Sequence, residues 1–145
     1  MESTRLTSDV RQLREGLKDL PEPVTQPALI LLSGLPGTGK SFLSRRLAER
    51  VPLLILESDL LRKTLFSSPD YTAGENSQLF QAIYQLVEEL LREGISLLLD
   101  ATNLAERFRE RLYGIADRLH AGWDAEGKPT RAKLEELGIG WVADV

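Results

Sequence analysis

The segment G-L-P-G-T-G-K-S at residues 34–41 constrains the fold of this chain more than any other feature. It fits the pattern G-x-x-x-x-G-K-[S/T] at each fixed position. The glycines allow a tight turn whose backbone N–H groups point inward at phosphate oxygens. Lys40 adds a positive charge for the β- and γ-phosphates, and the Ser41 hydroxyl is a hard oxygen ligand that suits Mg²⁺. The segment predicts a nucleotide-binding loop that includes Gly34, Leu35, Pro36, Gly37, Thr38, Gly39, Lys40, Ser41 and Phe42.

The residues on either side of this loop follow the order strand, loop, helix that the motif requires. Residues 28–33 form a short apolar run of strand length, and residues 42–50 place apolar and charged side chains at helical spacing. A Gly- and Pro-rich turn between a strand and a helix is the simpler alternative. That alternative explains neither Lys40 nor Ser41.

Composition limits the class of protein. The chain has 145 residues, 42% hydrophobic and 28% charged, which fits one soluble domain with a sizeable core. Its net charge of −4 gives no overall attraction to nucleic acid or anionic lipid, although a local basic groove would still bind nucleic acid. The absence of cysteine and the single histidine, His120, exclude disulfides and sites of several Cys or His ligands. With no secretory signal or membrane-spanning run, we expect a cytoplasmic protein that does not enter a membrane.

Short apolar runs alternate with helical patterns along the chain. The runs at 28–33, 53–56 and 95–99 predict three strands, and the helical patterns between and after them predict βαβ units with a parallel sheet. A short helix is expected at 60–66. A long helix is expected to begin at a capping box of Thr72 and Glu75 and to stop at Gly94. A last helix is expected from a second capping box, Asn103 with Glu106, to about residue 120.

The first 23 residues predict a separate amphipathic helix. Its leucine and valine residues recur at spacings of four and three, at Leu6, Val10, Leu13, Leu17 and Leu20. We expect this helix to start at Thr7 or Ser8, to stop at Pro21, and to pack on the chain's own core rather than on a partner. The chain then divides into an N-terminal helix (1–23), a nucleotide-binding core (24–120) and a short C-terminal segment (121–145).

Acidic residues follow the second and third predicted strands, where ligands bind in an open parallel sheet. Asp100 is a candidate Mg²⁺ ligand, and the alternative is an ordinary strand-end aspartate that helps to turn the chain. Asp59 is a candidate base for an acceptor hydroxyl, and the alternative is a cap for the next helix. Arg62, about one turn later, suits a substrate phosphate or carboxylate, and the alternative is a surface arginine.

Other polar and aromatic residues have simpler interpretations. Three arginines of the last predicted helix, Arg107, Arg111 and Arg118, are expected on a solvated face. Tyr71, Trp123 and Trp141 are able to stack on a base, but isolated aromatic residues more often serve packing. No N-K-x-D segment indicates a preference for guanine.

Three segments together resemble a family of small P-loop kinases: G-L-P-G-T-G-K-S, then E-S-D-L-L-R, then L-L-L-D-A-T-N-L with arginines behind it. That family includes the kinase domain of phage polynucleotide kinase, chloramphenicol phosphotransferase and zeta toxins. The resemblance covers roughly residues 28–120. It implies a three-layer α/β fold with a short parallel sheet of order 2-3-1 flanked by helices, and the use of ATP and Mg²⁺. It also implies catalytic roles for Lys40, Asp59, Arg62 and Asp100, with Ser41 and Asp100 at the metal.

The C-terminal segment departs from this family. Family members continue after the last helix into a fourth strand, an arginine-bearing lid, a fifth strand and a base-contacting loop, and residues 121–145 are too short for all of these. We therefore expect a truncated kinase core, or one whose lid comes from a partner subunit or a second copy. The expected function is transfer of the γ-phosphate of ATP to a hydroxyl of a small molecule or a nucleic-acid 5′ end. The alternatives are a catalytically weak ATP-binding module that regulates a partner, and an unstable fragment.

Overall fold

The structure is a computed structural model that describes residues 2–25, 27–32, 45–46, 48–49, 52–101 and 105–119. The predicted loop at 34–42 and the segment at 121–145 lie outside these residues. The elements of the described part are α1 (Glu2–Glu15), β1 (Leu29–Leu32), β2 (Leu53–Glu57), α3 (Ser58–Leu65), α4 (Ala73–Arg92), β3 (Ser96–Asp100) and α5 (Glu106–Arg118).

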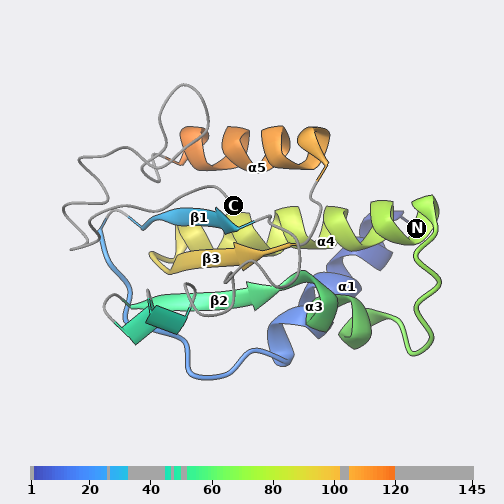
Figure 1. The fold of residues 1–145 in the computed structure, drawn as a ribbon, viewed down its shortest axis with the longest axis horizontal. Helices are drawn as coiled ribbons and strands as arrows, with labels where there is room; N and C mark the ends of the chain where they lie inside the picture. Colours follow the sequence, from blue (N-terminus) through green and yellow to red (C-terminus); the bar gives the residue numbers. More distant parts are fainter. Residues whose placement is uncertain are drawn as a thin grey trace.

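The three strands form a parallel sheet in which β3 lies between β1 and β2 (Figure 1). This order confirms the predicted 2-3-1 arrangement and the α/β class. The three consecutive side chains Leu97, Leu98 and Leu99 are all 0% exposed. Because successive side chains of a strand point to opposite faces, both faces of β3 are covered. The continuous apolar run therefore marks a central strand, as the sequence predicts.

Helix α4 packs on β3 and has α1 and α5 as neighbours (Figure 1). Its apolar stripe is buried and comprises Leu79, Ile83, Leu86, Val87 and Leu90. The burial of each such leucine is worth about 1.5–3 kcal/mol, so this stripe contributes much of the core's stability. No helix in the described ranges has both the length and the apolar character needed to cross a membrane.

Helix α1 packs on the chain's own core, as expected, but its predicted ends are wrong. It begins at Glu2 rather than at Thr7 or Ser8, and it ends at Glu15 rather than at Pro21. Gly16 follows at once, and its N–H donates to the Leu13 carbonyl at 3.2 Å in a last turn that does not continue. The apolar repeat continues past the helix into an irregular segment, where Leu17 packs partly buried against the core and Leu20 is 47% exposed.

Polar contacts fix α1 in place. The Arg14 guanidinium lies 3.5 Å from the Glu89 carboxylate and also pairs with Glu93, which raises the pKa of Arg14. The Gln12 amide donates to the Thr64 carbonyl of α3 at 2.7 Å. These contacts, together with the burial of the apolar face, join α1 to both α3 and α4.

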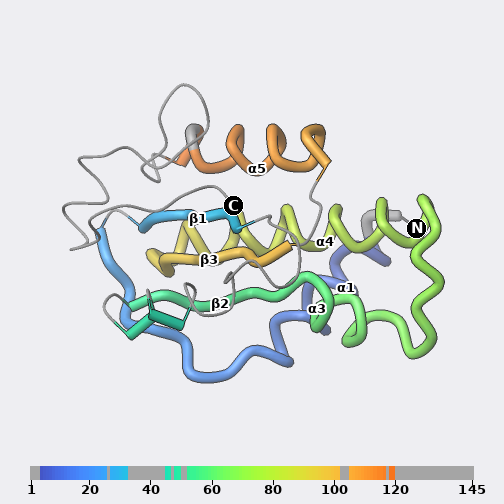
Figure 2. Tube along the Cα trace, viewed as in Figure 1, coloured from blue at the N-terminus to red at the C-terminus, as the bar shows by residue number. Residues whose placement is uncertain are grey.

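Helix α4 ends in a Schellman motif that also holds the segment before β1. The Ile95 N–H donates to the Leu90 carbonyl and the Gly94 N–H to the Leu91 carbonyl, each at 3.0 Å. Gly94 has φ of 86°, and its carbonyl accepts a 2.8 Å hydrogen bond from the Val24 N–H. Figure 2 shows the segment leading from α1 to the amino end of β1, past this turn. Gly94 therefore provides both the predicted helix stop and a point of close backbone approach.

We expect Gly94→Ala to destabilise the protein by at least about 2 kcal/mol, because alanine is strained at a positive φ. Its Cβ would also lie 2.8 Å from the Val24 carbonyl oxygen. The control is Gly114→Ala in α5, where a Cβ meets nothing within 4 Å. This control should stabilise by about 0.5–1 kcal/mol. Urea denaturation followed by circular dichroism measures both changes, and a Gly94→Ala protein as stable as wild type would contradict the assigned role.

Candidate functional site

The carboxyl ends of the three strands meet at one edge of the sheet, with Asp100 in the middle. Asp100 is in register with Leu32 of β1 on one side and with Glu57 of β2 on the other. The Ala101 N–H donates to the Leu32 carbonyl at 2.9 Å, which continues the pairing one residue past the end of β3. Because β1 ends two residues before Gly34, the chain enters the glycine-rich motif from a position next to Asp100.

Several predicted site residues lie outside the described part of the chain. They are the loop residues Gly34–Phe42, with Lys40 and Ser41 among them, and the cap residue Asn103. Three predicted site residues are described: Asp59, Arg62 and Asp100. The described residues contain no group of three or more His, Cys, Asp or Glu side chains placed to hold a metal ion.

Asp59 is the second residue of α3 and is exposed. The alternative that Asp59 or Ser58 caps this helix is wrong, because the cap position belongs to Glu57, whose side chain makes no capping hydrogen bond. Asp59 therefore presents a carboxylate directly after β2.

Glu57 is a carboxylate that the sequence reasoning did not single out. It is exposed and occupies the β2 position aligned with Asp100. Side chains at aligned positions of neighbouring parallel strands lie on the same face of the sheet, so the two carboxylates are neighbours. The sequence pattern indicates this carboxylate, because Glu57 follows the second apolar run just as Asp100 follows the third.

Arg62 is buried, with only 7% of its surface exposed, so the surface-arginine alternative is wrong. Its Nη2 donates to Asn76 Oδ1 at 2.6 Å, and its Nη1 lies 3.6 Å from Glu75 Oε2. Its Cζ lies 4.6 Å from the centroid of the Tyr71 ring. Among the described residues, no hydrogen-bond partner is found for Arg62 Nε, Arg62 Nη1 or Glu75 Oε1. Arg62 thus joins α3 to the start of α4 through a buried charge pair.

Glu75 also organises the loop between α3 and α4. Its Oε2 accepts hydrogen bonds from the Asp70 N–H at 2.8 Å and from the Tyr71 N–H. The Thr72 hydroxyl accepts from the Glu75 N–H at 3.2 Å, which is one half of the predicted capping box. The other half differs, because the Thr72 N–H donates to Asp70 Oδ1 instead. This bond is the main reason that the pKa of Asp70 is lowered from its ordinary value.

Three arginines of α5 are exposed, as predicted for a solvated face. Arg107 lies over the Phe108 ring, and Arg111 lies 5.3 Å from the Tyr84 ring centroid. Arg118 pairs with a glutamate of α4. Burial raises the pKa of Tyr84 to about 12, so this phenol stays protonated at neutral pH. The contacts of Arg111 and Arg118 join α5 to α4, whereas that of Arg107 lies within α5.

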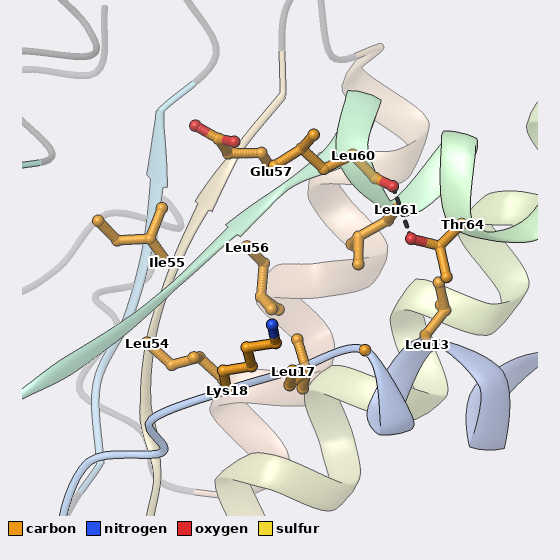
Figure 3. Close-up of a pocket in the computed structure, with 11 residues that line it drawn as sticks. Leu13, Leu17, Lys18, Leu54, Ile55, Leu56, Glu57, Leu60, Leu61 and Thr64 are labelled. Atoms are coloured by element: carbon orange, nitrogen blue, oxygen red, sulfur yellow. Dashed lines mark hydrogen bonds between the residues drawn. The ribbon is translucent and has the colours of Figure 1, made fainter.

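A pocket of about 240 Å³ opens between the end of α1, strand β2 and helix α3 (Figure 3). Leucines from all three elements line it: Leu13, Leu17, Leu54, Leu56, Leu60 and Leu61. Lys18 and Glu57 are among its other lining residues, whereas Asp59 and Asp100 are not. The pocket therefore lies on the flank of β2 and reaches the carboxyl edge of the sheet at Glu57.

Residues 29–125 match the model of a protein family described as an AAA domain. The matched range is well over half of the chain. It runs from the start of β1 past the end of α5, so it contains the glycine-rich motif and all three described candidate residues.

Solved structures with similar folds support the same architecture. APE1195 is 22% identical with a TM-score of 0.58, over 68% of this chain and 60% of that one. A candidate kinase from Chloroflexus aurantiacus J-10-fl is 27% identical with a TM-score of 0.51, over 68% and 57%. A structure from the PezAT chromosomal toxin-antitoxin system of Streptococcus pneumoniae is 18% identical with a TM-score of 0.57, over 77% and 52%. This chain therefore spans between half and two thirds of the length of each, and the likeness establishes an α/β fold of the P-loop type.

The buried pair of Arg62 and Glu75 yields a test of how the loop between α3 and α4 is held. We expect Glu75→Gln to destabilise the protein by about 3 kcal/mol, because it leaves the Arg62 charge buried without a counter-charge. The matched control in the same helix is Glu88→Gln, whose partners Arg92 and Arg118 are 61% and 59% exposed at their side chains. That change should cost less than about 1 kcal/mol.

Urea denaturation of wild type and the two variants measures the difference. Equal decreases in the free energy of unfolding for Glu75→Gln and Glu88→Gln would show that burial of the pair of Arg62 and Glu75 does not affect stability.

Proposed function

The chain belongs to the AAA domain family of P-loop proteins, and on this premise we propose that it is an ATP- and Mg²⁺-dependent kinase. It transfers the γ-phosphate of ATP to a hydroxyl group of a small molecule or of a nucleic-acid 5′ end. The observation that supports this most strongly is the hydrogen bond from Ala101 to Leu32, which brings Asp100 beside the strand that leads into the motif.

In this proposal the nucleotide and its metal are held by residues of two neighbouring strand ends. Lys40 would contact the β- and γ-phosphates, and Ser41 and Asp100 would hold Mg²⁺. The half-buried Asp100 carboxylate fits this ion, since Mg²⁺ prefers hard oxygen ligands. Mg²⁺, when bound, neutralises charge on the phosphate oxygens.

Asp59 acts as the base. Its exposed carboxylate takes the proton of the acceptor hydroxyl while that oxygen forms a bond to the γ-phosphorus. The bond between the γ-phosphorus and the β–γ bridging oxygen breaks, and ADP leaves with the electron pair. The position of Asp59 in the first turn of α3 supports this role, because it places an exposed carboxylate directly after β2.

Arg62 acts as a positioning residue in this proposal. Its contacts with Glu75 and Asn76 support this role, because they tie α3, which carries Asp59, to the start of α4. The regulatory-module alternative draws on two features, the short C-terminal segment, which lies outside the described residues, and the apolar N-terminal helix. Val10 and Leu13 of that helix are buried in the chain's own core, so we favour the enzyme.

We expect Asp59→Asn to lower kcat by about 10²–10⁴-fold, the usual contribution of a general base, while ATP affinity stays unchanged. Lys40→Ala should instead weaken ATP binding by about 10- to 100-fold, because it removes charge-assisted hydrogen bonds worth about 1.5–3 kcal/mol. The control is Asp19→Asn, the same substitution at an exposed position on the segment after α1.

Calorimetric ATP titrations and transfer of labelled phosphate to a panel of hydroxyl acceptors separate these effects. Full turnover by Asp59→Asn would remove Asp59 from the chemistry. Slow ATP hydrolysis that no acceptor stimulates would favour the regulatory module over the kinase.

A further inference from the structure

Tyr71 is exposed where an isolated aromatic residue was expected to pack. Of the exposed large hydrophobic side chains in the described part of the chain, it is the one aromatic residue, and 59% of its surface is exposed. The other three are aliphatic: Leu20, Val24 and Leu60. The packing interpretation of Tyr71 is therefore wrong, and its exposure needs another explanation.

The backbone of Tyr71 is held in a conformation that a tyrosine rarely adopts. Its φ is 59°, in the left-handed region that disfavours bulky residues. Its N–H donates to Glu75 Oε2, and the neighbouring Asp70 donates to the same oxygen. Strain of this kind persists only where surrounding contacts impose it, and it is concentrated at functional positions.

One face of the Tyr71 ring is supported by a buried cation. Arg62 Cζ lies 4.6 Å from the ring centroid, and the guanidinium is itself held by Asn76 and by Glu75. The ring therefore rests on a fixed support. A ligand that stacks on its other face loses little binding free energy to ordering of the Tyr71 side chain.

The position and electronics of this ring indicate what it binds. Asp59 and Arg62 are three residues apart on α3, so the exposed Asp59 and the buried Arg62 occupy neighbouring positions of the helix. From this spacing we place the ring that Arg62 supports on the side of α3 that carries the proposed base. The guanidinium on one face draws ring electron density toward itself. The other face then favours a neutral, electron-rich planar ring and disfavours a second cation.

We propose that Tyr71 is a stacking platform that selects acceptors whose hydroxyl is attached close to a planar aromatic ring. This inference rests on the proposed function, because the platform is argued to lie beside Asp59. Two kinds of acceptor carry such a planar ring. One carries a nucleobase, and the other is a small molecule with a phenyl group.

The test compares matched acceptors on matched variants. 2-Phenylethanol and 2-cyclohexylethanol present the same hydroxyl with a planar or a saturated ring, and adenosine and ribose make the same comparison for a nucleobase. Tyr71→Asn removes the ring and suits a left-handed backbone, whereas Tyr71→Phe keeps the ring. Stacking of a ring on an aromatic side chain is worth about 1–3 kcal/mol. We expect Tyr71→Asn to raise KM for a ring-bearing acceptor about 5- to 150-fold with kcat unchanged, and Tyr71→Phe to match wild type.

Equilibrium dialysis of the same four compounds against wild type and both variants separates failure of the platform from failure of the kinase. Tyr71-dependent binding of a ring-bearing compound without phosphate transfer would retain the platform and reject the kinase. Equal binding or turnover of planar and saturated acceptors, or a Tyr71→Asn protein that discriminates as wild type does, would overturn the platform. Preference for adenosine over 2-phenylethanol identifies the nucleobase as the ring, and the reverse preference identifies the phenyl group.

Discussion

The pairing of β3 with a strand on each side is the constraint on which the rest of this structure depends. Burial of three consecutive leucines keeps β3 at the centre, and the parallel register then aligns Leu32, Asp100 and Glu57. A slip of one residue would turn every β3 side chain to the opposite face. The apolar core therefore determines which polar residues meet at the carboxyl edge, although none of those residues contributes to the core.

A second, polar constraint organises the region beside that edge. Arg62 and Glu75 form a buried charge pair, and Glu75 also receives two backbone N–H groups from the loop between α3 and α4. Burying these charges is costly, so the pair is weak evidence of stability. Its consequence is geometric: it holds the Tyr71 ring outward at a strained backbone position beside α3.

Local patterns predicted the parts of the fold that local chemistry decides. The apolar runs located all three strands, and Gly94 marked the end of α4, because strand burial and a left-handed helix cap depend on adjacent residues. The first helix was misplaced because its apolar repeat continues past Gly16 into an irregular segment. The burial of Arg62 was missed because its partners lie 13 and 14 residues later, beyond any short-range pattern. Of the candidate site, Asp100 ends β3 and Asp59 lies in the first turn of α3, two residues past β2, and the roles assigned to them stay predictions.

The dependence of ATP binding on Mg²⁺ tests the central claim most directly, since that claim places Asp100 at the nucleotide's metal ion. ATP affinity is measured calorimetrically for wild type and Asp100→Asn, each with millimolar Mg²⁺ and with a chelator. The account predicts that Mg²⁺ strengthens ATP binding by wild type, that this gain is about 10- to 100-fold smaller in Asp100→Asn, and that affinity in the chelator is equal. An equal Mg²⁺-dependent gain in both proteins would contradict it.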